Sequence, residues 1–235
     1  LLGDGCYAEK VAVPDDMALP VPAGLSLAEA AAIPDAFATS YLNLCIEGGM
    51  KAGDTVFIQA GASGLGMAAI QLAKALGAKV VTSVGSEDKV RFVRNLGADV
   101  VINRKKEDIA AVMAKHPADI GMDCVAGDNL GPCLETMARG GRWIVIATLG
   151  GSKSELNMTD FFKRGIKLIG STLRSRTSEM KAQIFAGLEE KLWQSFSSGK
   201  IKVLIHKALP ISSAEEAHAI LQNQENLGKV VLTVK

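Results

Sequence analysis

The sequence predicts an α/β chain built around a doubly wound parallel sheet, and three observations support this class. Residues 54–86 hold a short apolar strand, a glycine-rich turn, an amphipathic helix and a second apolar strand, in that order. The apolar runs show no polar alternation, as expected of parallel strands that are buried on both faces. Strand and helix patterns then alternate as far as residue 170, which is typical of such sheets.

The region before this unit combines an extended pattern with helical ones. Residues 6–13 have the pattern of a strand, and three prolines then indicate loops. Ser26 and Glu29 form a capping-box sequence that opens an alanine-rich helix, which Pro34 interrupts. A second helical stretch is expected to continue toward Gly48.

The glycine-rich turn lies between the strand at residues 56–58 and a helix that is expected to end at Gly77, a usual position for a C-terminal glycine. The residues that define the turn are Gly61, Ser63, Gly64 and Gly66. The first and last glycines match a G-x-G-x-x-G pattern, whereas serine occupies the middle position. Small residues at a helix N-terminus let backbone N–H groups approach a pyrophosphate closely. The turn therefore predicts a dinucleotide site.

The later elements continue the alternation. Further strands are expected at residues 80–84, 100–102, 120–125, 143–146 and 166–170, and helices at residues 90–96, 109–113 and 130–137. Because the carboxyl ends of parallel strands meet at one edge of a sheet, the loops after these strands are expected to line one crevice.

The last third of the chain has a different character. It carries an amphipathic helix over residues 179–197, a strand at 203–209, a helix at 214–222 and a strand at 230–234. This pattern predicts a small second domain, to which residues 1–25 would also belong.

The end of the second strand favours NADPH over NADH. An NAD site usually places an acidic residue about 20 positions after the last glycine of the turn, to bind the ribose hydroxyl. Ser86 occupies that position and Gly85 precedes it, so the expected carboxylate is absent. Together with Lys89 they offer a hydroxyl, turn N–H groups and a cation, which suit a 2′-phosphate. The same residues also fit an ordinary helix cap with Lys89 in solvent, and both interpretations can hold together.

The composition is that of a globular chain of one or two domains. Of 235 residues, 48% are hydrophobic, and the formal net charge is +1. This balance gives no general reason to expect a nucleic-acid partner. No apolar stretch approaches the length of a membrane span, and no secretory leader pattern is present. The chain begins with Leu1 instead of methionine, so we expect a fragment or a processed product.

Cysteine and histidine are too scattered to predict a metal site. These residues are Cys6, Cys45, Cys124, Cys133, His116, His206 and His218. Zinc requires clustered thiolate or imidazole ligands. We therefore expect no bound metal, reduced thiols and a cytoplasmic location.

Several stretches together resemble the quinone oxidoreductases of the medium-chain dehydrogenase/reductase superfamily, and most closely the zeta-crystallin-like and tumour-suppressor-inducible branch. They are residues 32–39, 59–74, 103–108, 173–176 and 228–232. The resemblance covers essentially the whole chain. It implies a Rossmann domain at residues 26–172, with residues 1–25 and 173–235 as remnants of a β-rich, GroES-like catalytic domain. Most of that domain would precede Leu1 and would carry an active-site Asn and Tyr.

The resemblance also implies an activity and a partner. A zinc-independent oxidoreductase would transfer hydride from NADPH to a quinone or a related activated carbonyl compound such as an enone. Two copies of the chain would pair through the strand at residues 167–170.

The resemblance assigns most of the cofactor contacts. The pyrophosphate would lie against Ser63, Gly64, Leu65 and Gly66, and the 2′-phosphate against Gly85, Ser86 and Lys89. The nicotinamide end would be bounded by Thr39, Leu149, Gly150, Thr172, Leu173 and Arg174. Arg104 stands where many relatives have tyrosine; it either contacts the 2′-phosphate or adenine, or lies in solvent. No catalytic residue is assigned.

Two alternative functions remain open from the sequence. The chain could be a non-catalytic NADPH-binding protein with a structural or regulatory role. RNA binding through Arg174, Arg176 and Lys181 is not favoured, because no aromatic platform or basic face accompanies them.

Overall fold

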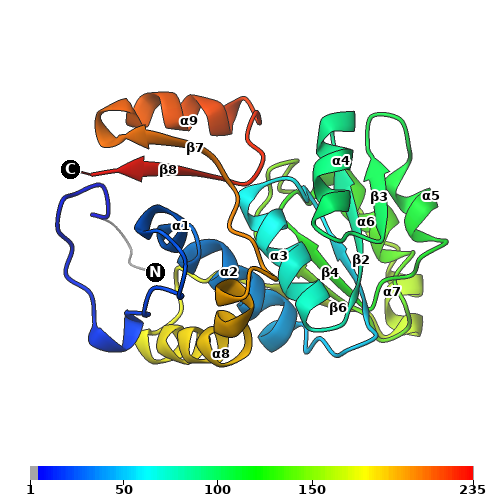
Figure 1. The fold of residues 1–235 in the computed structure, drawn as a ribbon. Coiled ribbons are helices and arrows are strands. Elements are labelled where there is room, and N and C mark those ends of the chain that lie inside the picture. The colour runs from blue at the N-terminus through cyan, green and yellow to red at the C-terminus, as the bar shows by residue number, and fades with distance from the viewer. Residues whose placement is uncertain (1–4, 235) are drawn as a thin grey trace.

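The computed structural model describes residues 5–234. They form a six-stranded parallel sheet with helices on both faces, and a separate two-stranded sheet closer to the chain ends (Figure 1). The predicted α/β class with a doubly wound parallel sheet is therefore confirmed. The expected division into segments 1–25, 26–172 and 173–235 stays a prediction, and its residues 1–4 and 235 lie outside the described part.

The large sheet has the strand order β3-β2-β1-β4-β5-β6, and every neighbouring pair is parallel. Its strands are β1 (Thr55–Ile58), β2 (Lys79–Val84), β3 (Val100–Asn103), β4 (Ile120–Asp123), β5 (Arg142–Val145) and β6 (Lys167–Gly170). The order reverses between β1 and β4. Ligands of open α/β sheets bind at such a switch point, outside the carboxyl ends of the strands.

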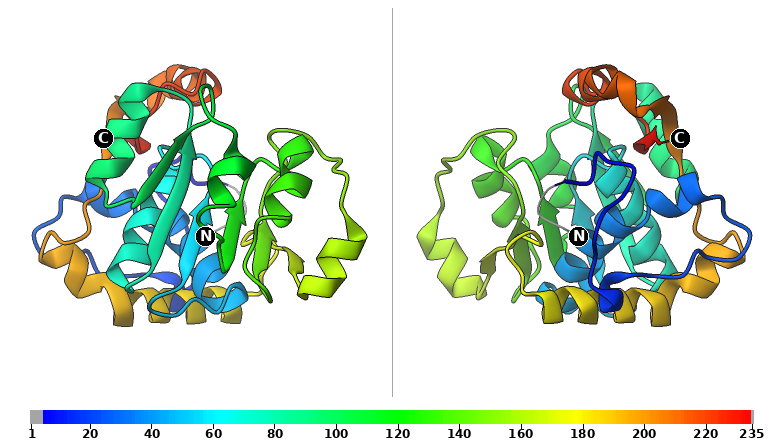
Figure 2. Two further views of the ribbon diagram at one scale, coloured as in Figure 1. Left: turned by 90° about the vertical axis from the view of Figure 1, so that its right-hand side faces the viewer. Right: turned by 90° about the vertical axis from the view of Figure 1, so that its left-hand side faces the viewer.

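The helices divide between the two faces and the C-terminal unit (Figures 1 and 2). They are α1 (Leu27–Ala31), α2 (Pro34–Tyr41), α3 (Gly64–Ala75), α4 (Glu87–Asn95), α5 (Ile109–Met113), α6 (Leu130–Leu134), α7 (Met158–Arg164), α8 (Ser178–Ser197) and α9 (Ala214–Gln222). A π-helix, η2 (Leu42–Glu47), extends α2, and short 3₁₀ turns are η1 (Asp15–Met17), η3 (Gly127–Asn129) and η4 (Ile211–Ser213). In both ribbon figures α9 lies at the top and α8 at the bottom.

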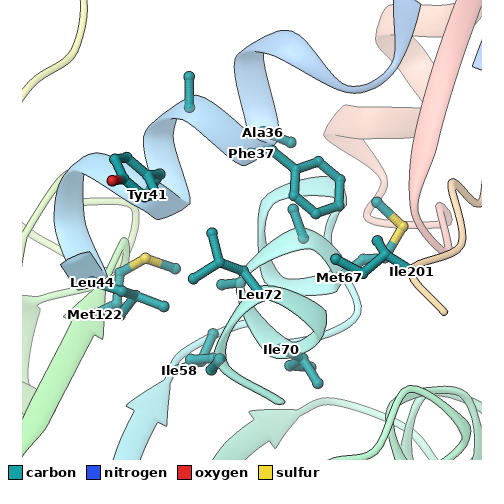
Figure 3. Close-up of a cluster of buried hydrophobic side chains, with 14 of the residues drawn as sticks. Ala36, Phe37, Tyr41, Leu44, Ile58, Met67, Ile70, Leu72, Met122 and Ile201 are labelled. Atoms are coloured by element: carbon teal, nitrogen blue, oxygen red, sulfur yellow. The ribbon is translucent and has the colours of Figure 1, made fainter. Parts of the chain in front are cut away.

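The larger core fills the face of the sheet that α2, α3 and α8 cover. Phe37 of α2 and Leu72 of α3 are fully buried there above Ile58 of β1 (Figure 3). The ring of Phe37 meets Phe196 of α8 edge to face, with centroids 4.8 Å apart. The long helix α8 is thus part of the same core as the first βαβ unit.

A second core lies on the opposite face, under α5 and α6. Phe57 of β1 and Trp143 of β5 stack there, with ring centroids 5.6 Å apart. Gly121 of β4 lies between them in the sheet and leaves room for the indole ring, because a Cβ at Gly121 would be 2.2 Å from Trp143 Cε3.

The two-stranded sheet consists of β7 (Ile205–Pro210) and β8 (Lys229–Thr233), which pair in parallel and are connected through α9. A small core of Leu209, Ala217 and Ile220 joins the helix to the strands. The segment between α9 and β8 runs back to the large sheet, where Gly228 pairs with Ser63. This contact positions the C-terminal unit, which consists of β7, α9 and β8, over the switch point.

One local prediction was wrong, and one helix was not predicted. No strand forms in residues 5–26, because the apolar residues of segment 6–13 find no neighbouring strand to pair with. Helix α7 was not expected, although Asn157 caps its start and Gly165, in the left-handed region, follows its end. The capping box of Ser26 and the break at Pro34 are confirmed.

No helix within residues 5–234 is both long enough and apolar enough to cross a membrane.

Replacing Gly121 with alanine tests the packing of the second core. The added methyl group would enter the Trp143 ring, and overpacking of this kind costs roughly 1–3 kcal/mol. Gly170→Ala is the matched control, since no heavy atom lies within 4 Å of a Cβ there. Urea unfolding should show a clearly lower free energy of unfolding for Gly121→Ala alone; equal values for the two variants would contradict the packing described here.

Candidate functional site

A cavity of about 680 Å³ lies at the carboxyl edge of the large sheet, at its switch point. Its walls come from segments far apart in the chain: residues 59–65, 83–89, 125–129, 149–150 and 221–230. Single side chains at Asp35, Arg104 and Ile109 complete it. The predicted crevice at the strand ends therefore exists, and its size is that of a site for a drug-sized or larger molecule.

Hydrogen bonds within the glycine turn, from both backbone groups and the Ser63 side chain, hold its conformation. Ser63 caps α3, because its Oγ accepts the N–H of Gly66 at 3.0 Å and its carbonyl accepts the N–H of Met67 at 2.8 Å. The Ser63 N–H donates to the Ala60 carbonyl at 2.9 Å, and Ala60 has a φ of 54°, in the left-handed region. These bonds leave the N–H groups of Gly64 and Leu65, the first two of the helix, available at the cavity wall.

A Cβ at each glycine of the turn would meet a different neighbour. At Gly61 a Cβ would lie 2.1 Å from Thr82 Oγ1 on β2, and at Gly66 it would lie 2.5 Å from the Ala60 carbonyl oxygen. At Gly64 the nearest atom would be Cδ of Lys229, at 2.4 Å. The outer glycines thus let the helix pack onto the sheet, whereas Gly64 gives space to the C-terminal segment.

The C-terminal segment is bonded directly to the glycine turn. The N–H of Gly228 donates to the Ala62 carbonyl at 3.1 Å, and Gly228 has a φ of 88° that favours glycine. The next residue, Lys229, forms an ion pair with Asp35 of α2 at 3.2 Å. Residues 221–230 therefore form a wall of the cavity beside the glycine turn.

Positive side chains gather at the end of β2. Lys89 Nζ lies on the cavity wall and donates to the Gln224 carbonyl at 2.6 Å. Burial lowers the pKa of Lys89, and the nearby Arg104 and Lys105 lower it further. The guanidinium group of Arg104 covers Gly85, where a Cβ would lie 3.2 Å from Nη2.

The acidic residue that follows β2 is directed away from this cluster. Glu87 accepts hydrogen bonds from Lys106 and from Asn103 Nδ2, each at 2.7 Å, and these bonds lower its pKa. Ser86 caps α4 by accepting the Lys89 N–H at 3.4 Å, so the ordinary capping interpretation holds for its hydroxyl. An anion at the end of β2 would meet the side chains of Lys89 and Arg104.

A fully buried carboxylate shapes the wall that follows β4. Asp123 Oδ1 accepts the N–H groups of Val125 and Ala126 at 2.7 and 2.9 Å, and Oδ2 accepts Trp143 Nε1 at 3.0 Å. Ala126 is thereby held at a φ of 52°. The N–H of Gly150 then donates to the Val125 carbonyl at 2.7 Å, which joins the loops after β4 and β5.

The structure brings many of the expected site residues together. Those on the cavity wall are Ser63, Gly64, Leu65, Gly85, Lys89, Arg104, Leu149 and Gly150. The expected residues outside the wall are Thr39, Gly66, Ser86, Thr172, Leu173 and Arg174. Gly66 and Ser86 act within the turns, as described above.

The residues expected at the nicotinamide end occupy varied surroundings. Thr39 is half-buried on α2, and its carbonyl accepts Asn43 Nδ2 at 2.7 Å. Leu173 is buried in the larger core, whereas Thr172 and Arg174 are exposed. The Arg174 carbonyl accepts Lys181 Nζ at 3.1 Å.

Sequence reasoning missed Gln59 and the C-terminal wall. Gln59 follows β1 directly, and no pattern distinguishes it from other polar residues at strand ends. The wall of residues 221–230 is a polar run between a helix and a strand. A glycine at position 228 is the one local signal that could have indicated a close backbone approach there, and it entered the sequence analysis only through the family resemblance.

Comparison with known proteins identifies the family. Residues 64–188 match the family model described as zinc-binding dehydrogenase. The human quinone oxidoreductase is 30% identical over 97% of this chain and 69% of its own length, and the mouse quinone oxidoreductase is 31% identical with the same coverage. A solved NAD-dependent alcohol dehydrogenase superposes with a TM-score of 0.83 at 33% identity, covering 98% of this chain and 66% of that one.

The fold, the match to the family model and the coverage of these relatives together define a medium-chain dehydrogenase/reductase. The chain belongs to the zinc-binding dehydrogenase family. Within that family it is similar to quinone oxidoreductases, of which it spans about two thirds of the length.

The family is described as zinc-binding, but residues 5–234 do not provide a set of side chains that could hold a zinc ion. Within residues 5–234 no three His, Cys, Asp or Glu side chains lie close enough to hold an ion. Burial raises the pKa of Cys45 and of Cys124 to about 11 and that of Cys133 to about 12, which disfavours the thiolates that zinc would need.

A double-mutant cycle tests the role of Asp123. In Asp123→Asn an amide N–H₂ group replaces one accepting oxygen and meets an N–H donor, which should cost roughly 1–3 kcal/mol of unfolding free energy. Trp143→Phe removes the indole donor, so the same Asn substitution should cost less in that background. Chemical unfolding of the four proteins measures the coupling; strictly additive losses would show that the indole bond does not hold the carboxylate.

Proposed function

We propose that this chain binds NADPH in the cavity and forms the nucleotide-binding part of an oxidoreductase that passes hydride to a quinone or a related activated carbonyl compound. The main support for this proposal is the glycine turn at the switch point, which presents the N–H groups of Gly64 and Leu65 at the start of α3. These donors and the positive end of the helix suit a pyrophosphate. The similarity to quinone oxidoreductases supports the reaction class.

The charges at the end of β2 support NADPH as the cofactor. Lys89 and Arg104 flank Gly85 on the cavity wall, and Glu87 is bonded to other partners. In the proposed complex Lys89 Nζ exchanges the Gln224 carbonyl for the 2′-phosphate, a charge-assisted bond that is stronger than a neutral one. NADH offers no such anion.

The nicotinamide end would lie beside Leu149 and Gly150, toward Thr39 and residues 172–174. Bound NADPH supplies the hydride, and the protein supplies position and exclusion of water. The ionisable side chains of the described wall are Asp35, Lys89, Arg104 and Lys229. Asp35 and Lys229 bind each other, so we assign no general acid within this chain and route no step through a metal.

Titration of the purified chain with NADPH and NADH, followed by nicotinamide fluorescence, tests this proposal. We expect saturable binding that is tighter for NADPH, and NADPH oxidation when an ortho-quinone is added. Binding without turnover of a quinone or an enone would favour the non-catalytic NADPH-binding alternative for this chain. Absence of binding by both nucleotides would overturn the proposal.

Lys89→Ala should reduce the preference for NADPH. Loss of one charge-assisted bond of roughly 1.5–3 kcal/mol weakens NADPH binding by about tenfold or more, while NADH binding changes little. Lys115→Ala is the matched control, because it removes the same charge from an exposed position before β4, at the opposite edge of the sheet. Dissociation constants from fluorescence titration provide the measurement. A Lys89→Ala variant that loses equal affinity for both nucleotides would refute the 2′-phosphate assignment.

We also propose that two copies pair along β6. This strand ends the sheet on one side, and an open strand edge can pair with another copy. Met158, Phe162 and Leu168 on α7 and β6 expose apolar side chains at that end.

Leu168→Asp should convert the proposed dimer to a monomer, because it places a charge on the pairing strand. Val21→Asp, at an equally exposed apolar residue of the N-terminal loop, should leave the dimer intact. Light scattering after size-exclusion chromatography gives the mass of each protein. A monomeric wild-type chain, or a dimer that survives Leu168→Asp, would argue against pairing at this edge.

A cytoplasmic location remains a prediction.

A further inference from the structure

Gln59 is a buried polar side chain with an unused hydrogen-bond donor. It follows β1 directly, is only 3% exposed and lines the cavity. Its Nε2 is buried and has no hydrogen-bond partner among the described residues. Buried donors in folded proteins are almost always paired, and one left unpaired costs stability. Because Gln59 also lines the cavity, this donor points to an acceptor that a ligand brings.

The neighbours of Gln59 explain why its donor remains unused. In the sheet Ile58 pairs with Thr82 on β2 and with Met122 on β4, so Gln59 lies between Ser83 and Asp123 on the same face. The Asp123 carboxylate is a strong acceptor in this row. It is already occupied by the three N–H donors of the β4 loop and of Trp143.

We propose that Gln59 is a nucleotide-binding residue, whose Nε2 donates to an acceptor oxygen on the adenosine diphosphate part of the cofactor. This inference rests on the proposed function. Gln59 directly precedes the glycine turn and lies beside Ser83 at the end of β2, next to where a pyrophosphate and its adjoining ribose would lie. The donor is uncharged and lies on the half that NADPH and NADH share. Gln59 therefore strengthens binding of both, whereas Lys89 distinguishes them.

Gln71 offers a matched control of the same residue type. It is 7% exposed on α3, and it is fully bonded: Nε2 donates to the carbonyls of Met67 at 3.4 Å and Lys202 at 2.9 Å, and Oε1 accepts the Lys202 N–H at 2.8 Å. It does not line the cavity. A structural glutamine and a ligand-binding glutamine should respond in opposite ways to the same substitution.

The experiment compares Gln59→Met and Gln71→Met, which keep the chain length and remove the amide. Calorimetry gives the Kd of ADP and of NADPH, and thermal unfolding without nucleotide gives the Tm. We expect Gln59→Met to weaken ADP and NADPH binding by the same factor, about tenfold. Its Tm should equal or exceed that of the wild type, since an unpaired buried donor is removed. Gln71→Met should lower the Tm and change both Kd values by less than about threefold.

Wild-type affinities in Gln59→Met, or a lowered Tm without loss of affinity, would overturn the inference. If the wild type binds ADP but not NADPH, the proposed function fails, and the ADP affinities still decide the role of Gln59. If it binds neither, both fail. Should Gln59→Met not fold, Gln59→Asn withdraws the amide by one methylene and is expected to weaken ADP binding in the same way.

Discussion

The cavity depends on one backbone contact, in which the Gly228 N–H donates to the Ala62 carbonyl over 3.1 Å. Two glycines permit this contact: Gly64 has no side chain to collide with the C-terminal segment, and Gly228 adopts a φ of 88°. A single backbone hydrogen bond contributes only about 0.5–1.5 kcal/mol net, so the surrounding structure must hold the segment in place. Gln71 contributes to this, because its side chain bonds both backbone polar groups of Lys202, just before β7.

The polar groups around the cavity fall into two sets. Ser63 and Asp123 have their hydrogen bonds filled by the protein, and they fix the loops after β1 and β4. Within residues 5–234 Gln59 Nε2 has no hydrogen-bond partner, and the Lys89 side chain donates to the Gln224 carbonyl. The first N–H groups of α3 have no partner inside the helix. Polar groups whose hydrogen bonds are made within the protein fix the shape of the cavity, whereas groups with spare donors can bind a ligand. The second set therefore marks where an anionic nucleotide would lie.

Local signals made the parallel sheet and the glycine turn predictable from the sequence. Helices α5 and α9 begin and end at the expected residues, because the apolar spacing that predicts them lies in adjacent positions of the sequence. The strand expected at residues 6–13 does not form, because the apolar residues of a segment do not specify a pairing partner. The wall of residues 221–230 was not predicted, because it depends on contacts such as that of Ala62 with Gly228, which lie far apart in the chain. The free donor of Gln59 was not predicted either, because it depends on which groups occupy the Asp123 carboxylate in the folded chain.

Hydrogen exchange with and without NADPH would test most directly whether the glycine turn and the C-terminal segment form one nucleotide site. We expect NADPH to slow exchange both in peptides covering residues 60–67 and in peptides covering residues 223–229, with further protection near Lys89. Peptides from the opposite edge of the sheet, such as those covering residues 114–119, should not change. Protection of the glycine turn without any change at 223–229 would contradict the joint site. Unchanged exchange throughout, at saturating NADPH, would contradict nucleotide binding at this cavity.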